Sequence, residues 1–156
     1  RKKNLNLDEV YFISSSSVST LKINDIHNAI IGDLSTEDKI INFKKRDFAI
    51  KNFANNSARF NFDELCGIET SAEDYLYLVR HINTLFLENV PDFSNSNSNQ
   101  QERFINLIDV LYDNKINLIM SSEKKVEDLN SAHYLRDKFT RTKSRLIEMK
   151  SKNYRS

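Results

Sequence analysis

The sequence predicts an α/β protein in which helices flank a short parallel sheet, with a small antiparallel β meander before it. Apolar residues recur at helical spacing in the first part of the chain, alternate with polar residues in the second, and form helix and strand patterns in turn in the third. We expect one compact unit with three parts: an N-terminal helix and loop segment over residues 1–37, the meander over 38–67, and an α/β segment over 68–156 that ends in a long helix.

Composition excludes several protein classes. The chain has 156 residues and a net charge of +1, which is enough for one core and gives no overall attraction to nucleic acid. No apolar run approaches the roughly 20 residues of a membrane helix, and no leader pattern opens the chain. Cys66 is the only cysteine, and the three histidines share no ligand spacing. We therefore expect no nucleic-acid partner, no membrane-spanning segment, no metal site and a reducing compartment.

The first part carries one strand pattern and one helix pattern. Residues 10–13 form a short apolar run, and the serine run at 14–17 is typical of a mobile loop. Ile23 and Ile30 belong to an apolar series at helical spacing, which predicts a helix over about residues 21–34.

The second part changes to a period of two. Phe48 and Ile50, and further on Phe60 and Phe62, alternate with polar or small residues, as in half-buried strands. The asparagine pair at 55–56 predicts a turn, because asparagine tolerates positive φ. These features predict the antiparallel meander.

The third part alternates between helix and strand patterns, which implies crossover connections and parallel strands. The expected elements are a helix over 72–83, a strand over 84–90, a flexible loop over 92–101, a helix over 101–113, a strand over 116–120 and a helix over 132–150. The last helix carries one apolar stripe, which we expect to dock on the sheet. Its members are Leu135, Phe139, Thr142, Leu146 and Met149.

Two places are candidates for a functional site. In an open parallel sheet, ligands gather beyond the carboxyl ends of the strands, which are here residues 88–91 and 121–123. The alternative is that these two stretches are ordinary solvated loops. Lys138, Arg141 and Arg145 share a second face of the last helix and suit a phosphate. The alternatives are that this face is simply solvated, or that its arginines form ion pairs that fix the last helix to the rest of the fold. The candidate ion-pair partners are Asp109, Asp113 and Glu123.

Specific strings resemble the C-terminal part of the ZapE family of AAA+-like P-loop ATPases. They are ARFNFDELCG at 58–67, DYL at 74–76, NTLFLENVP at 83–91, RFINLIDVLYD at 103–113, LIMSSE at 118–123 and FTRTKSRLIEMKS at 139–151. The resemblance covers about residues 38–155, and Arg1 matches the end of a family Asp-Tyr-Arg stretch. The family's Walker A and Walker B motifs lie upstream of Arg1, and the chain contains neither GxxxxGK[ST] nor GxGxxG.

The resemblance implies a parent enzyme that hydrolyses ATP to ADP and phosphate with Mg²⁺ and remodels protein partners in cell division or inner-membrane protein quality control. ATP and Mg²⁺ would be held by the N-terminal ATPase half, so the fragment alone is expected to bind neither and to be inactive. The implied partners are that ATPase half, the tubulin-like division protein and further copies in an oligomer. The implied location is the cytoplasm, peripheral to the inner membrane, or the matrix side in a mitochondrion.

The resemblance also assigns candidate residues. Arg141 and Arg145 match the arginine pair of the terminal motif and are assigned to phosphate sensing or an arginine-finger role, in cis or across a subunit boundary. Arg103 matches one of two neighbouring family arginines, with Glu102 at the other position, and is grouped with Asn89 as cofactor-binding. The alternative functions are a non-catalytic protein-interaction module from the same family and a small-molecule-binding domain that uses the loops at Asn89 and Ser121.

Overall fold

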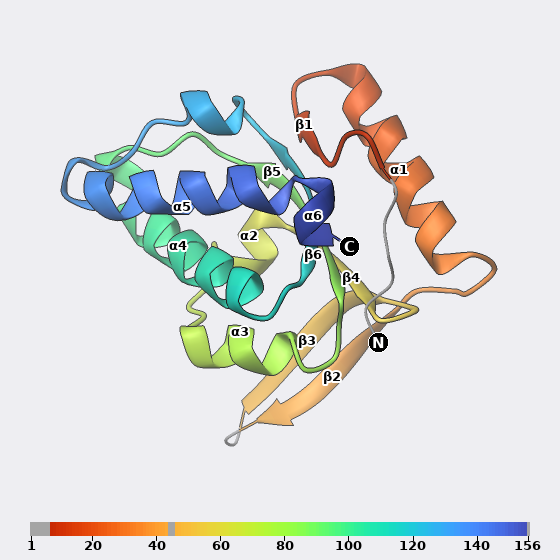
Figure 1. The fold of residues 1–156 in the computed structure, drawn as a ribbon. Coiled ribbons are helices and arrows are strands. Elements are labelled where there is room, and N and C mark those ends of the chain that lie inside the picture. Colours follow the sequence, from red (N-terminus) through yellow and green to blue (C-terminus); the bar gives the residue numbers. More distant parts are fainter. Residues whose placement is uncertain (1–6, 44–45, 156) are drawn as a thin grey trace.

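A four-stranded parallel sheet forms the centre of the chain (Figure 1). The computed structural model describes residues 7–43 and 46–155, so Arg1 lies outside the described residues. The strand order is β1-β6-β5-β4. The bounds are β1 (Tyr11–Ile13), β4 (Ser57–Asn61), β5 (Thr84–Val90) and β6 (Asn117–Ser122). All three strand pairs are parallel, which confirms the predicted α/β class with a short parallel sheet.

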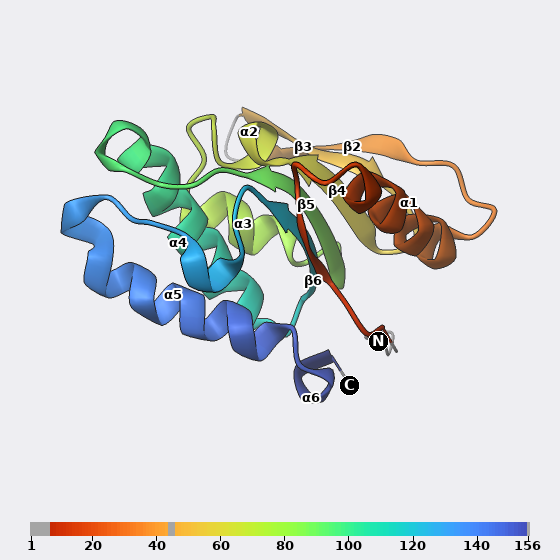
Figure 2. The ribbon, with the colours of Figure 1, turned by 90° about the horizontal axis from the view of Figure 1, so that it is seen from above.

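Helices cover both faces of the sheet, as a parallel sheet requires (Figure 2). One face carries α1 (Ser17–Ile31), whose Ile23 and Ile30 pack in one cluster with Phe86 and Ile119 of the sheet. The other face carries the larger core under three helices, α3 (Ala72–Leu78), α4 (Ser98–Asp113) and α5 (Arg136–Met149).

The stripe predicted for the last helix is buried and fixes the position of α5. All five of its members are buried, namely Leu135, Phe139, Thr142, Leu146 and Met149. Phe139 meets Phe93 edge-on, with 5.5 Å between ring centroids, and lies 6.5 Å from Phe104 of α4. This contact anchors the first turns of α5 against α4, and thereby sets which way the opposite, polar face of α5 points.

The antiparallel part is a two-stranded hairpin of β2 (Glu37–Phe43) and β3 (Arg46–Phe53). The period-two pattern around Phe60 belongs to β4, which pairs in parallel with β5 and so lies in the main sheet. Asn61 ends β4 because it caps α2 (Phe62–Leu65): its side chain accepts from the N–H of Phe62, and Glu64 accepts from the N–H of Asn61. The turn predicted at Asn55 and Asn56 is confirmed, and both have positive φ.

Several element bounds differ from the sequence prediction because polar side chains cap helices. The helix predicted from residue 21 begins at Ser17, where Ser16 accepts from the N–H of Val18. The loop predicted over 92–101 contains the short 3₁₀ helix η1 (Asn95–Asn97) and the start of α4. The helix predicted over 72–83 stops at Leu78. The remaining short helices are η2 (Val126–Asp128), η3 (His133–Leu135) and α6 (Lys152–Arg155).

No helix among residues 7–43 and 46–155 is both long enough and apolar enough to cross a bilayer. No group of three or more histidine, cysteine, aspartate or glutamate side chains there is placed to hold a metal ion.

Candidate functional site

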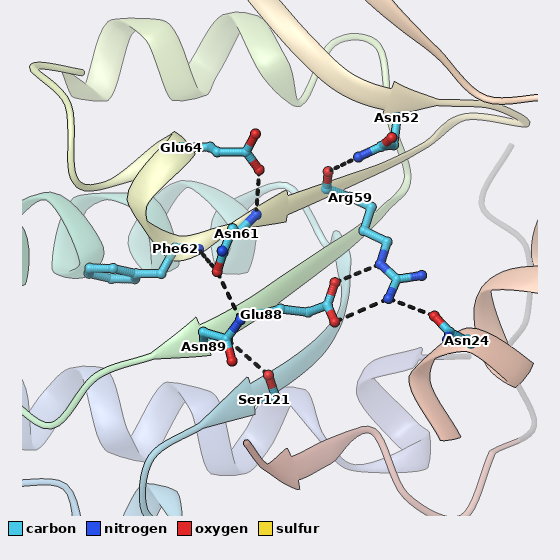
Figure 3. A network of polar contacts seen from close by, with 9 residues as sticks. All are labelled: Asn24, Asn52, Arg59, Asn61, Phe62, Glu64, Glu88, Asn89 and Ser121. Carbon is cyan, nitrogen blue, oxygen red and sulfur yellow. Dashed lines mark hydrogen bonds and ion pairs between the residues drawn. The ribbon is translucent and has the colours of Figure 1, made fainter. Parts of the chain in front are cut away.

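The carboxyl ends of β4, β5 and β6 form a continuous polar edge (Figure 3). The backbone N–H of Asn89 donates to Ser121 Oγ at 2.9 Å, and Asn89 Nδ2 donates to Asn61 Oδ1 at 3.0 Å. One step further on, the N–H of Glu123 donates to the carbonyl of Val90 at 2.8 Å. The two segments expected to meet at this edge, 88–91 and 121–123, do lie side by side, and their polar groups bond to one another.

Asn89 has an unusual backbone conformation for a strand residue. Its φ is 64°, in the left-handed region that asparagine tolerates better than most residues. The pairing of β5 with β6 shifts register between Leu87 and Val90, so Asn89 lies in a bulge. The bulge directs the exposed Asn89 side chain toward Asn61 rather than into the core.

A half-buried ion pair crosses the face of the sheet that α1 covers (Figure 3). Arg59 of β4 donates two hydrogen bonds to Glu88 of β5, from Nε to Oε1 at 2.6 Å and from Nη2 to Oε2 at 3.1 Å. The same Nη2 donates to Asn24 Oδ1 of α1 at 2.8 Å. Fork-shaped pairing of this kind is the strongest arginine–carboxylate geometry. It fastens α1 to the two strands, so we interpret Arg59 as a structural residue.

Arg145 has a partner on α4. Its guanidinium forms an ion pair with Asp109 and lies 4.8 Å from the centroid of the Tyr112 ring. The Tyr112 hydroxyl in turn donates to both carboxylate oxygens of Glu148 at 2.9 Å, and this hydrogen bond raises the pKa of Tyr112. Asp109 is one of the three partners that the sequence suggested, so Arg145 holds α5 against α4.

Arg141 lies one turn earlier on α5 in a different setting. Its side chain is exposed and, with Lys138 and Asp109, lines a small cavity of about 130 Å³ between α4 and α5. Within residues 7–43 and 46–155, no hydrogen bond or ion pair engages its guanidinium. Arg141 therefore presents an unneutralised charge at the surface, whereas Arg145 does not.

Arg103 of α4 bonds to a backbone carbonyl. Its Nη1 donates to the carbonyl oxygen of Cys66 at 3.1 Å, at the end of α2. The Cys66 side chain is buried, and burial raises the pKa of its thiol to about 12, which makes it unreactive at neutral pH. Arg103 thus joins α4 to α2. In the part of the chain that the structure describes, no hydrogen bond or ion pair connects Asn89 with Arg103, Arg141 or Arg145.

Sequence reasoning missed the Arg59–Glu88 pair. Glu88 follows the apolar run of β5, which is a weak signal of a polar contact, whereas Arg59 fits the alternation of β4 and gives no such signal. The pair follows only from the register, in which Asn61 lies opposite Glu88 and Arg59 opposite Phe86, so that Arg59 and Glu88 are diagonal neighbours on one face.

A family model described as AFG1-like ATPase matches residues 1–156, which is the whole chain. The chain belongs to the AFG1-like ATPase family. This assignment agrees with the resemblance in the strings at 58–67 and 139–151 and with the parallel sheet.

Curated relatives place this AFG1-like chain within longer proteins. The cell division protein ZapE of Escherichia coli K12 is 29% identical over 126 residues, covering 81% of this chain and 34% of that protein. Lactation elevated protein 1 homolog B of Danio rerio is 28% identical over 123 residues, covering 77% of this chain and 24% of that protein. A Schizosaccharomyces pombe protein is 36% identical over 84 residues, covering 54% of this chain and 18% of that protein. The chain thus spans about a third or less of these relatives, and no solved structure matches it.

Proposed function

We propose that the chain is the C-terminal region of an ATPase whose whole polypeptide hydrolyses ATP to ADP and phosphate and uses the energy to remodel protein partners. The family match over all 156 residues carries this proposal. ATP and Mg²⁺ would be bound outside this chain, because the chain has only two glycines and neither GxxxxGK[ST] nor GxGxxG. On its own the chain is therefore expected to be inactive.

Within this ATPase we assign Arg141 to the nucleotide phosphates and Arg145 to a positioning role. The assignment rests on the guanidinium of Arg141, which is exposed and has no partner in the part of the chain that the structure describes, and on the pairing of Arg145 with Asp109. A guanidinium directed at the transferred phosphoryl group stabilises the charge that develops in the transition state. Arg141 would act on the nucleotide of its own polypeptide or, in an oligomer, on that of a neighbouring copy.

The biological setting is proposed by analogy with the named relatives. The name of ZapE states a role in cell division, which supports a bacterial role at the division site with the tubulin-like division protein as partner. In a eukaryote the corresponding setting is protein quality control at the matrix side of the mitochondrial inner membrane. In both settings we expect a peripheral position at the membrane and contact with the polypeptide's own ATPase half.

Arginine substitutions in the whole polypeptide test the role of α5. Arg141→Ala should lower ATP turnover by a factor on the order of 10² or more without changing the thermal midpoint of unfolding, because it removes transition-state stabilisation only. Arg136→Ala is the matched control, since Arg136 is exposed on the same helix. Normal turnover in Arg141→Ala would rule out a phosphate role for this residue.

The second candidate function is a non-catalytic protein-interaction module of the same family. The missing phosphate-binding loops favour it. It predicts that the whole polypeptide neither binds nor hydrolyses ATP, whereas the ATPase proposal predicts both.

A further inference from the structure

Among the described residues, β1 and β4 are the two edge strands of the sheet. The outer side of β4 faces β3, whose Asn52 Nδ2 donates to the carbonyl of Arg59 at 2.9 Å, whereas no described strand lies beside the outer side of β1. β1 pairs with β6 alone, and it lies at the opposite side of the sheet from β4 (Figure 1). The backbone bonds to β6 come from alternate residues: Val10 accepts from the N–H of Met120, and Ser14 donates to Ser122. Because backbone groups alternate along a strand, the N–H and C=O of Tyr11 point away from β6.

The Tyr11 backbone is held in place for pairing. Its side-chain hydroxyl donates to the carbonyl of Leu146 on α5 at 2.7 Å, while Phe12 is buried under α1 on the other face. Both faces of β1 are therefore fixed to the body of the protein. At its outer edge the carbonyl of Ile13 accepts from the N–H of Ser16 and from the Ser19 hydroxyl, so among the described residues the backbone groups of Tyr11 are the ones left free for pairing. A free, rigid strand edge is a template on which an extended chain can add a further strand.

A cavity lies along this edge. It has a volume of about 410 Å³ and is bounded by β1, the first turns of α1, the segment after β6 and the end of α5. Val18 and Val126 contribute apolar surface, and Val18 is 49% exposed. The cavity can therefore receive side chains of a strand that pairs with β1.

The charge around the cavity favours an acidic occupant. Lys22 is neutralised by Glu9, with 3.5 Å between Nζ and Oε1. Lys125 and Lys150 also line the cavity, are exposed, and have no ion-pair partner within the described ranges, which leaves two lysines against the single carboxylate of Glu127. Carboxylates of an incoming chain would satisfy both lysines.

We propose that β1 is the docking edge for an extended, acidic segment of a protein partner, which adds a strand beside β1 and places carboxylates next to Lys125 and Lys150. This inference rests on the proposed function, because an enzyme that remodels proteins must hold them. Backbone bonds to Tyr11 would supply affinity for any extended chain, and the lysines would supply the preference for acidic ones.

A fluorescence-anisotropy titration on the whole polypeptide tests the proposal. The probe is a labelled nine-residue peptide of alternating valine and glutamate. Its two controls are the peptide with lysine in place of glutamate and the acidic peptide with alternate backbone nitrogens methylated. We expect saturable binding of the acidic peptide only. Lys125→Glu and Lys150→Glu should each weaken it, and together by about tenfold or more, whereas Lys39→Glu on β2 should leave it unchanged.

Four results would overturn the proposal. Equal binding of the methylated peptide would show that strand pairing does not determine the affinity. Equal binding of the lysine peptide would show that charge does not determine it. Unchanged peptide affinity in the double lysine variant, together with new self-association, would show that the lysines only prevent β1 from pairing with other copies of the chain. Binding to the isolated chain but not to the whole polypeptide would show that another part of the same protein covers β1.

Two further measurements separate a loss of docking from a loss of folding or of ATP hydrolysis. If the double variant does not fold, the affinity of the wild-type protein for the acidic peptide must fall as salt rises, because the contact is ionic. Arg141→Ala should bind the peptide normally, and the double lysine variant should hydrolyse ATP normally in the absence of peptide. The docking proposal and the ATPase proposal can therefore fail independently.

Discussion

Arg141 and Arg145 lie one helical turn apart on α5, yet their surroundings differ. Arg145 is 20% exposed, pairs with Asp109 and lies over the ring of Tyr112. Arg141 is exposed and unpaired among the described residues. The motif that contains both arginines therefore combines one residue that is bound to α4 with one whose guanidinium is exposed, which is the basis for the roles that we propose for them.

The Arg145–Asp109 pair should make a small, measurable contribution to stability. A double-mutant cycle with Arg145→Ala and Asp109→Ala should give a coupling free energy of about 0.5–1 kcal/mol in urea unfolding, because the pair is only partly shielded from water. Zero coupling would mean that Arg145 does not hold α5 to α4 and would return it to the set of ligand-binding candidates.

His27 gives the fold a predicted pH dependence. It is 8% exposed, its Nε2 has no hydrogen-bond partner among residues 7–43 and 46–155, and burial lowers the pKa of its imidazole. The folded state therefore prefers the neutral ring, and its stability is lost as the pH falls from the ordinary pKa of about 6.5 toward the lower folded value. The free energy of unfolding should fall more steeply between pH 7.5 and 5.5 in the wild type than in His27→Gln. Equal slopes would contradict this.

At the scale of elements, helix ends are set by single polar residues. Ser16 begins α1, and Gly32 ends it with φ 61°. No atom lies within 4 Å of a Cβ built at Gly32, so a substitution there meets backbone strain and no steric clash.

Gly32→Ala and Gly32→Asn should therefore both destabilise the protein by about 1–3 kcal/mol in urea unfolding, because φ 61° with ψ −127° lies outside the left-handed helical region that asparagine tolerates. An unchanged unfolding midpoint in either variant would show that the backbone conformation at Gly32 does not set the cost.

The sequence predicted the type of most elements but not their partners. The alternation around Phe60 correctly indicated a strand, yet a period of two does not say which strand will pair with it. Its neighbour in the sheet, β5, begins at Thr84, which is 23 residues after β4 ends at Asn61. The polar run after Pro91 was predicted as a loop because serine and asparagine are common in loops, but Ser94 there caps η1.

Site residues were predictable only in part for the same reason. Spacing placed Asn89 at the carboxyl edge and Arg141 and Arg145 on one helix. It could not choose Asp109 over Asp113 or Glu123 as the partner of Arg145, because that choice depends on how α4 and α5 cross. The cavity beside β1 collects side chains from four separate segments, and no local pattern indicates such a site.

At the scale of the whole molecule, the chain is a sheet covered on both faces, with one polar edge at the carboxyl ends of the strands and one open edge at β1. It belongs to a family of ATPases while spanning about a third or less of the relatives compared. We therefore propose that the rest of the polypeptide binds the nucleotide and that this region presents Arg141 and holds a protein partner at β1.

The most direct test of the central claim is steady-state ATP hydrolysis by the whole polypeptide, measured with and without Mg²⁺ and beside the isolated 156-residue chain at equal concentration. We expect Mg²⁺-dependent turnover by the whole polypeptide and none by the isolated chain. Absence of hydrolysis by a folded whole polypeptide would contradict the ATPase assignment for this protein and favour the interaction module.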